Sequence, residues 1–499
     1  MKKLKLFALA VLIAGVLAFG ACGEQDEQHN DTQVGDGGAT VQDTETPDRQ
    51  DDEEHNDGDL ADTSGFVVST RRENLPERDF DGMYFTFLVE DPLEKVWTYT
   101  NMIVEEMSGV VIDDAFYRRN TIVEERFNIR LRQTPVALAQ NQNFFNQSVL
   151  AGDYSFDVAF ISYGAAANLA IQNRALNLNE LPYIDLSMPW WDQNSIRDLS
   201  IAGQSFIVAS DMTIGDNDNT WLIYFDKQHV SDLGLDCPYQ LVRDGLWTME
   251  AMLSMMRAAH VVDPVTGQNE INGLRTHDEN VPALWIAGGH TAIGVDTHGM
   301  PYLNIMNERF VAVFDMLREI MLDNSTANTH PVYISAGLRN GDVLFATEIL
   351  SFVREYRENE RDFGILPMPK FDVYQDSIHT YVALSAPLAI VPMHHPDPEG
   401  LSIILEALAA EGHRTIMPAY YLVAIENQFT RDLESAEMLN IAFDTRLYDM
   451  AVVFNFGLIH SRLVAAHSNP HTSIASLYES SLRVVQAQIE RAFSAFDEG

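Results

Sequence analysis

The chain has 499 residues and a formal net charge of −41 at pH 7, with 73 acidic and 32 basic residues. This acidity argues against nucleic-acid binding, which needs clustered Lys and Arg to neutralise phosphates, and against direct adhesion to anionic lipid. At about 150 residues per domain the length allows two or three domains. A hydrophobic content of 46% is ample for large cores.

The N-terminus has the pattern of a secretory signal peptide. Lysines near the start precede an uncharged apolar run over residues 6–20. This run is shorter than the roughly 20 residues that a membrane-spanning helix needs. Gly20-Ala21-Cys22 then resembles the bacterial lipobox, although Phe19 stands where that motif usually has Leu. We therefore predict a lipoprotein signal peptide over residues 1–21 and lipidation, for example by palmitate, at Cys22. The alternative is a plain secreted protein with an incidental Cys.

Residues 22–66 are predicted to form an acidic, disordered tether. The part over 23–62 is rich in Asp and Glu, has Arg49 as its one basic residue and contains no aromatic residue. Such a segment buries too little apolar surface to offset the entropy of ordering, and its like charges extend it. Cys237 is the only other cysteine, so a lipidated Cys22 leaves no partner for an intrachain disulfide. We then expect Cys237 to be a packed residue.

The folded part begins with a strand–helix–strand pattern. An aromatic and β-branched run over residues 83–89 predicts a buried strand. Asp113 and Asp114 can cap a helix that stops at Asn128, and residues 129–132 then alternate between apolar and basic side chains. The expected buried face of this helix consists of Ala115, Phe116, Arg119, Ile122, Val123 and Phe127. The order predicts two parallel strands joined by a crossover helix.

The alternation of strands and helices continues along the chain. Further strands are predicted over residues 157–162, 220–225, 343–346 and 363–366. Helices are predicted over residues 164–171, after Trp247-Thr248, around 310–321, and over 401–411, 432–450 and 477–493. We find no internal repeat, and no long low-complexity linker beyond the tether. This favours α/β lobes joined by several short crossings over domains strung on one linker.

Familiar catalytic and metal-binding motifs are missing from the sequence. It contains no H-E-x-x-H, no G-x-S-x-G and no P-loop. Asp216 and Asp218 imitate a calcium loop, but Trp221 and Lys227 stand where that loop needs Gly and Glu. A metal at His394-His395 would lack an evident third ligand. We therefore predict no catalytic residue, no metal and no cofactor.

Several short motifs follow one another in the order seen in a known family. They are residues 114–120 leading to 123–129, Asp157-Val158 with Ser162, Pro189-Trp190-Trp191-Asp192 before 203–206, 223–227, 245–248, and 362–370 with its Gly-x-x-Pro-x-Pro turn. In the 223–227 motif, Phe225 intervenes and Asp226 replaces the family's Asn. Over roughly residues 83–493 the chain resembles the extracellular solute-binding protein family 1. These are ABC-transporter lipoproteins that include the maltose-binding proteins.

The resemblance implies a two-lobed, type II periplasmic-binding-protein-like α/β fold with an inter-lobe cleft and multiple hinge crossings. One lobe would comprise residues 67–213 and 347–392, and the other residues 214–346 and 393–499. The implied function is to deliver a small ligand, expected to be a sugar or oligosaccharide, to an ABC transporter permease. The implied protein is a monomer on the extracytoplasmic face of the bacterial membrane, held there through its lipid anchor only. The alternatives are a lipid-anchored polysaccharide hydrolase and a surface adhesin without a small ligand.

Sugar sites combine flat aromatic rings with carboxylates and amides, which guides the choice of candidate residues. Trp97 and Tyr163 follow the carboxyl ends of predicted strands, where a cleft is expected. By resemblance, Trp285 lies near the aromatic platform of the second lobe. The expected ligand contacts are Trp97, Ser162, Tyr163, Trp190, Trp191, Asp216, Asp218, Asn219, Trp285, Glu348 and Tyr381.

Some of these assignments leave alternatives open. Trp190 and Trp191 are as consistent with the core as with the cleft. Residues 216–219 are as consistent with a solvated turn as with ligand contact. Trp247 is expected to pack at the start of its helix rather than to touch ligand.

Overall fold

The computed structural model describes residues 60–61, 67–201, 203–297, 300–330, 334–356, 361–423, 433–469 and 471–497. The predicted signal peptide, Cys22 and nearly all of the predicted tether lie outside the described residues. All elements discussed below belong to the unit Asp57–Gly499. Within the described ranges, no helix has the length and apolar character needed to cross a membrane.

The first sheet has five strands in the order β4-β3-β5-β16-β6. Its strands are β3 (Met83–Glu90), β4 (Ile129–Val136), β5 (Val158–Ser162), β6 (Ile207–Val208) and β16 (Pro387–Ile390). Strand β3 pairs in parallel with both β4 and β5, and β16 runs antiparallel to β5 and β6. The predicted β3–helix–β4 unit with a parallel strand pair is therefore confirmed.

Helix α1 (Val111–Phe127) is the predicted crossover, and it ends as expected with Asn128 in the left-handed conformation at φ 50°. It begins before Asp113, which lies in the first turn instead of capping the helix. Arg119 is fully buried, and its guanidinium donates to the carbonyls of Met102 and Met212. Ile122 is 40% exposed, so its prediction as a core residue is wrong.

The second sheet has six strands, with β12-β9-β13-β7-β14 in order and β8 paired to β9. Its strands are β7 (Trp221–Asp226), β8 (Val261–Val262), β9 (Asn269–Thr276), β12 (Thr326–Asn328), β13 (Val343–Ile349) and β14 (Phe363–Leu366). Strand β9 is parallel to β12 and β13, whereas β7 is antiparallel to β13 and β14. Each sheet therefore directs the carboxyl ends of several parallel strands to one edge.

The chain crosses between the sheets more than once. Residues 209–220, with the short helix α5 (Gly215–Asp218), connect β6 to β7. Residues 367–386 connect β14 to β16, and within them β15 (Thr380–Tyr381) pairs in parallel with β17 (Arg446–Leu447). Both crossing segments end beside the edges where the parallel strands of the two sheets terminate.

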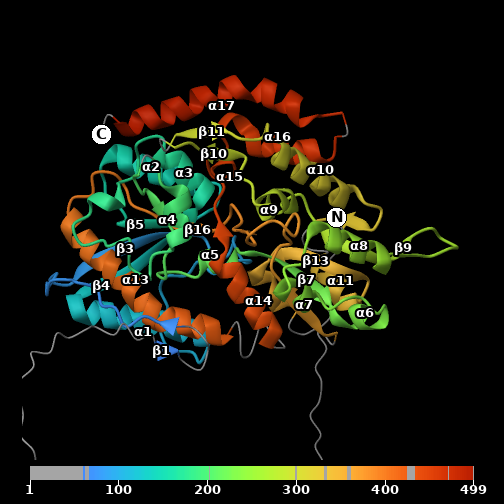
Figure 1. The fold of residues 1–499 in the computed structure, drawn as a ribbon. Helices are drawn as coiled ribbons and strands as arrows, with labels where there is room; N and C mark the ends of the chain where they lie inside the picture. Colours follow the sequence, from blue (N-terminus) through green and yellow to red (C-terminus); the bar gives the residue numbers. More distant parts are fainter. Residues whose placement is uncertain are drawn as a thin grey trace, which may run out of the picture. The chain divides into compact units, whose positions relative to one another are not determined.

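Two elements lie elsewhere than the predicted lobe boundaries place them. Strand β14, expected with the first lobe, pairs with β7 of the six-stranded sheet. Helix α13 (Pro398–Tyr421), expected with the second lobe, packs along α1, which covers the five-stranded sheet (Figure 1). The other lobe boundaries stay a prediction.

Strands β1 (Leu60–Ala61) and β2 (Val67–Val68) form a short antiparallel pair. The remaining α-helices and strands surround these sheets. They are α2 (Asn141–Ala151), α3 (Tyr163–Ala170), α4 (Gln193–Leu199), α6 (Lys227–Asp232), α7 (Pro238–Arg243), α8 (Met249–Ala259), α9 (Asn280–Ala287), β10 (Ile293–Val295), β11 (Pro301–Leu303), α10 (Glu308–Leu322), α11 (Ile334–Asn340), α12 (Val353–Tyr356), α14 (Leu433–Asp444), α15 (Met450–Phe454), α16 (Ile459–His467) and α17 (Ile474–Asp497). Helix α17 runs over the β10–β11 hairpin at the top of Figure 1.

Helix α14 ends before the expected residue 450, because the chain turns into β17. Cys237 is exposed at the start of α7, so the expectation that it is packed is wrong.

Candidate functional site

A cavity of about 680 Å³ lies where the carboxyl ends of the parallel strands of both sheets meet. Ser162 ends β5 in the first sheet, while Glu348 and Ile349 end β13 in the second. The lining residues are Trp97, Ser162, Gly164, Ala165, Trp221, His277, Glu279, His330, Glu348, Ile349, Phe352, Ala383, Leu384 and Ser385. Open α/β sheets bind ligands outside the carboxyl ends of their strands, and this cavity has that position.

Two indole rings line the cavity from different sides. Trp97 lies in the loop after β3 and is partly buried against the core. Trp221 opens β7 and donates its indole N–H to Asn280 Oδ1 at 3.1 Å. Its ring also meets the edge of His277 at a centroid distance of 5.0 Å and packs against Tyr381 at 6.1 Å. Trp221 is therefore held in one orientation, whereas Trp97 comes from a loop at the opposite sheet.

The wall formed by the second sheet contains two carboxylates and an imidazole. Glu348 Oε1 accepts the backbone N–H of Ile349 at 3.0 Å, and Glu348 Oε2 lies 3.3 Å from His277 Nε2. His277 Nδ1 accepts the backbone N–H of Glu279 at 3.3 Å, which leaves the imidazole proton on Nε2. Glu279 also accepts from the Tyr381 hydroxyl at 3.4 Å, and burial raises the pKa of Glu279 above its ordinary value.

The opposite wall rests on a buried ion pair. The Lys95 ammonium pairs with Glu90, contacts the Ser385 carbonyl, and lies 3.4 Å from Ser162 Oγ. Glu90 in turn accepts from the Ser162 backbone N–H at 2.9 Å and from its hydroxyl at 2.6 Å. Burial lowers the pKa of Lys95, and the Glu90 charge opposes this effect. This network fixes Ser162 and the crossing segment at Ser385 against the first sheet.

The structure brings three of the predicted contacts, Trp97, Ser162 and Glu348, to this cavity. Tyr163 and Tyr381 are fully buried next to it. The Tyr163 hydroxyl donates to the Val382 carbonyl at 2.6 Å, and the Tyr381 hydroxyl accepts from the Leu384 N–H at 3.1 Å. Both tyrosines therefore hold the crossing segment that forms part of the cavity wall.

Three of the predicted aromatic contacts lie in the core and do not line this cavity. Trp190 and Trp191 donate to the two oxygens of Glu406, each at 2.9 Å. Trp285 donates to Asp449 Oδ2 at 2.9 Å. Burial raises the pKa of Glu406 to about 7, although both indole N–H groups act against this rise. The buried indole N–H groups of these three Trp residues thus bind acceptors that are far away in the sequence.

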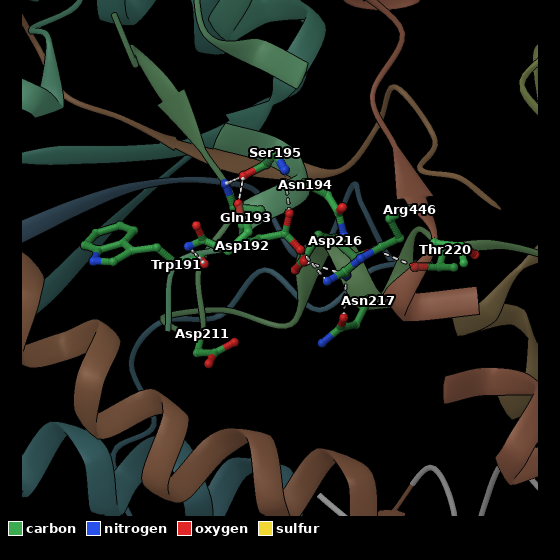
Figure 2. Close-up of polar contacts among 12 residues, drawn as sticks. Trp191, Asp192, Gln193, Asn194, Ser195, Asp211, Asp216, Asn217, Thr220 and Arg446 are labelled. Carbon is green, nitrogen blue, oxygen red and sulfur yellow. Dashed lines mark hydrogen bonds and ion pairs between the residues drawn. The ribbon is translucent and has the colours of Figure 1, made fainter. Parts of the chain in front are cut away.

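Asp216, Asp218 and Asn219, which were also predicted as ligand contacts, are buried on and beside α5, so the alternative of a solvated turn is wrong. Asp216 pairs with Arg446 at 2.7 Å, and burial raises the pKa of Asp216 to about 6. Arg446 also pairs with Asp192 at 2.6 Å, which Figure 2 shows. Asp218 pairs with Arg354 at 2.8 Å. These charges bind the first crossing to other parts of the chain and do not line the cavity.

Asn219 connects the two crossings instead. Its amide oxygen accepts from the Ser385 hydroxyl at 2.7 Å, and its N–H₂ donates to Thr98 at 3.1 Å. It therefore lies behind Ser385, which does line the cavity. Trp247 is buried and donates to the Pro367 carbonyl at 3.0 Å, as a packing residue would.

Sequence reasoning missed Trp221, His277 and Glu279 as cavity residues. His277 and Glu279 directly follow β9, which was not predicted as a strand because its sequence NEINGLRT is mostly polar. Polar residues that follow the carboxyl end of a strand are expected to line the cleft. This rule would have indicated both residues if the strand had been predicted. Trp221 lines the cavity because its strand is antiparallel to β13 and so begins at the edge where β13 ends.

The topology and the position of the cavity define the class of the fold. It is the mixed α/β fold of the two-lobed periplasmic binding proteins, with two open sheets and the cavity at their strand ends. The predicted fold class, α/β of type II, is thus confirmed.

Several solved structures with this fold are structures of sugar-binding proteins. The sugar-binding protein MalE from Xanthomonas citri shares 12% identity, covers 84% of this chain and 100% of its own, with a TM-score of 0.57. The cyclic α-maltosyl-1,6-maltose binding protein from Arthrobacter globiformis shares 11% identity over 82% and 99%, with a TM-score of 0.56. The maltose/maltodextrin-binding domain MalE from Bdellovibrio bacteriovorus, bound to maltotriose, shares 12% over 82% and 100%, with a TM-score of 0.51. No protein-family model matches the chain, and no curated protein matches it by sequence.

Proposed function

We propose that this chain is a family 1 solute-binding protein that captures a sugar or oligosaccharide for an ABC transporter. The observation that carries the proposal is the cavity at the strand ends of both sheets, with Trp97 and Trp221 in its walls. Aromatic rings stack on the apolar faces of sugars, and the cavity's carboxylates and hydroxyls can accept or donate hydrogen bonds to sugar hydroxyls. The solved structures that share this fold include sugar-binding proteins, which supports the same class of ligand for this chain.

Ligand capture would work by closure of the two sheets around the cavity. A ligand that contacts both walls makes more interactions in a closed form than in an open form, and so shifts the equilibrium towards closure. The closed form would then dock on the permease. The buried networks behind Ser162 and Ser385 are the parts that would keep each wall rigid during this change.

We further propose that Cys22 anchors the protein on the extracytoplasmic face of the membrane. The basis is the sequence pattern of residues 1–22, together with the acidic segment that follows. Replacing Cys22 with Ala should release the protein from membranes in a fractionation experiment. A variant that still fractionates entirely with membranes would mean that the anchor lies elsewhere.

The test of ligand capture is isothermal titration calorimetry of the purified protein with neutral and aminated mono- and oligosaccharides, followed by chromatography of the mixtures. The proposal predicts saturable binding of at least one saccharide, which is recovered unchanged. Absence of binding to any saccharide would contradict it.

A second candidate function is hydrolysis of a polysaccharide. The specific observation in its favour is that Glu279 and Glu348 both line the cavity and that the pKa of Glu279 is raised, as in a general acid. Shortened saccharides in the chromatogram would establish this alternative. Loss of that cleavage in Glu279→Gln would assign it to the cavity.

A further inference from the structure

The cavity wall of the second sheet has a carboxylate without a hydrogen-bonding partner on one oxygen. The side chain of Glu348 is 4% exposed, and within the described part of the chain its Oε2 atom has no hydrogen bond. His277 Nε2 lies 3.3 Å away but also lacks a hydrogen bond, so this contact lacks hydrogen-bond geometry. A buried ionised oxygen without a donor is costly, and such groups in native structures call for an explanation.

Three basic residues near the cavity each pair with a carboxylate other than Glu348 and Glu279. Lys95, behind the opposite wall, pairs with Glu90. Arg354, next to the cavity residue Phe352, pairs with Asp218 through both carboxylate oxygens at 2.8 and 3.0 Å. Arg275 on β9 pairs with Asp342 at 3.0 Å.

The titratable groups that line the cavity lie on or directly after three strands of the second sheet. His277 and Glu279 follow β9, His330 follows β12, and Glu348 lies on β13. Two of these four groups are carboxylates, and no Lys or Arg is among the lining residues that the structure describes. The cavity therefore offers acceptors and negative charge for a ligand that brings its own donor.

We propose that the ligand is a saccharide that carries a protonated amino group, and that Glu348 and Glu279 bind this cation. This inference rests on the proposed function and names its substrate class. An ammonium group supplies the donor that Glu348 Oε2 lacks, and charge-assisted hydrogen bonds of this kind are stronger than neutral ones. The sugar ring would lie on the aromatic surface of Trp97, whose π face also favours a nearby cation.

The test compares ligands that differ only in an amino group against a hydroxyl group. We would titrate the full-length protein with glucosamine and glucose, and with the β-1,4-linked glucosamine trimer and cellotriose, at a pH where the amines are protonated. The inference predicts that the aminated member of a pair binds about tenfold tighter or more. Added NaCl should weaken binding of the aminated member more than that of the neutral one.

Variants then assign the preference to the two carboxylates. Glu348→Gln keeps the shape of the side chain but removes its charge, and should weaken the aminated ligand about tenfold while changing the neutral ligand little. Glu279→Gln provides a second, independent variant if Glu348→Gln does not fold. Glu490→Gln, on the exposed face of α17, is the matched control and should leave both affinities unchanged.

The outcomes separate this inference from the proposed function. Equal or tighter binding of the neutral members, or of maltotriose alone, would overturn the amine inference and leave saccharide capture intact. An equal loss for both ligands in Glu348→Gln would also overturn it. Binding of spermidine but of no saccharide would show cation recognition, and it would overturn both the proposed function and the saccharide part of this inference. Binding of none of these probes would overturn both.

Discussion

The carboxylates on helix α5 and those of the cavity are both buried, but their charges are balanced in different ways. Asp216 and Asp218 each pair with an arginine, Arg446 at 2.7 Å and Arg354 at 2.8 Å. Glu348, in contrast, has an oxygen with no hydrogen bond from any described residue, and it faces the cavity. A carboxylate that is hydrogen-bonded to an arginine holds segments together, whereas a carboxylate oxygen that faces a cavity without a hydrogen bond can bind a ligand. Sequence alone would have ranked the α5 aspartates above Glu348.

The largest expected effect comes from breaking the paired cluster. Arg446→Met would leave Asp192 and Asp216 without their shared guanidinium, and uncompensated buried charges are strongly destabilising. We expect the free energy of unfolding, measured with urea, to fall by about 3–5 kcal/mol. Arg243→Met, which removes the partner of Glu437 in an exposed ion pair, is the control and should change stability far less. Equal stability of Arg446→Met and the wild-type protein would contradict the structural role.

A smaller effect on the free energy of unfolding is expected from Glu406. Its carboxylate accepts hydrogen bonds from two neutral indole N–H groups instead of pairing with a cation. Burial raises its pKa to about 7, so the folded protein takes up a proton there more readily than the unfolded chain does. This stabilising contribution is complete at pH values below the unfolded pKa and is lost as the pH rises through about 7. Between about pH 5 and 8 we expect a loss on the order of 1–3 kcal/mol.

The measurement for Glu406 is urea unfolding across this pH range in the wild-type protein and in Glu406→Gln. In the variant, the free energy of unfolding should fall less steeply as the pH rises. The part of the fall caused by Asp216, whose pKa is raised to about 6, should remain. Glu490→Gln should reproduce the wild-type curve. An unchanged pH dependence in Glu406→Gln would show that the folded state does not shift the titration of Glu406.

On the cavity side, loss of one aromatic wall should weaken ligand binding without unfolding the protein. Trp97 is partly exposed in its loop, so Trp97→Ala creates no deep core void. Removing a stacking ring should reduce the binding free energy by about 1–3 kcal/mol, which raises the dissociation constant roughly 5- to 150-fold. Calorimetry with the saccharide that binds the wild-type protein measures this change. Tyr374→Ala, which removes an aromatic ring that is 88% exposed, is the control. Unchanged affinity in Trp97→Ala would remove Trp97 from the site.

Much of the first sheet could be predicted from the sequence because its local patterns agree with its tertiary structure. The run over β3 is apolar apart from Thr86 and Glu90, and the first half of β4 alternates as a half-buried strand does. Strand β9 could not be predicted from the sequence because it is mostly polar and contains Gly273. That glycine is explained by tertiary packing, since a Cβ there would come within 2.4 Å of the Met256 carbonyl on α8.

The candidate site was predictable only where strand ends could be recognised. Trp97 and Ser162 follow or end strands with clear patterns, and both line the cavity. Trp190, Trp191 and Trp285 did not reach it because their N–H groups bind Glu406 and Asp449, which are more than 150 residues away in the chain. No local pattern in the sequence indicates such partners.

The most direct test of the account is a crystal structure of the protein with the saccharide that binds it most tightly. The account predicts the intact ligand in the cavity, in contact with Trp97 from one wall and with Trp221 and Glu348 from the other. An amino group of the ligand should lie within hydrogen-bond distance of Glu348 Oε2. A ligand bound elsewhere on the protein, or in contact with only one of the two walls, would contradict the account.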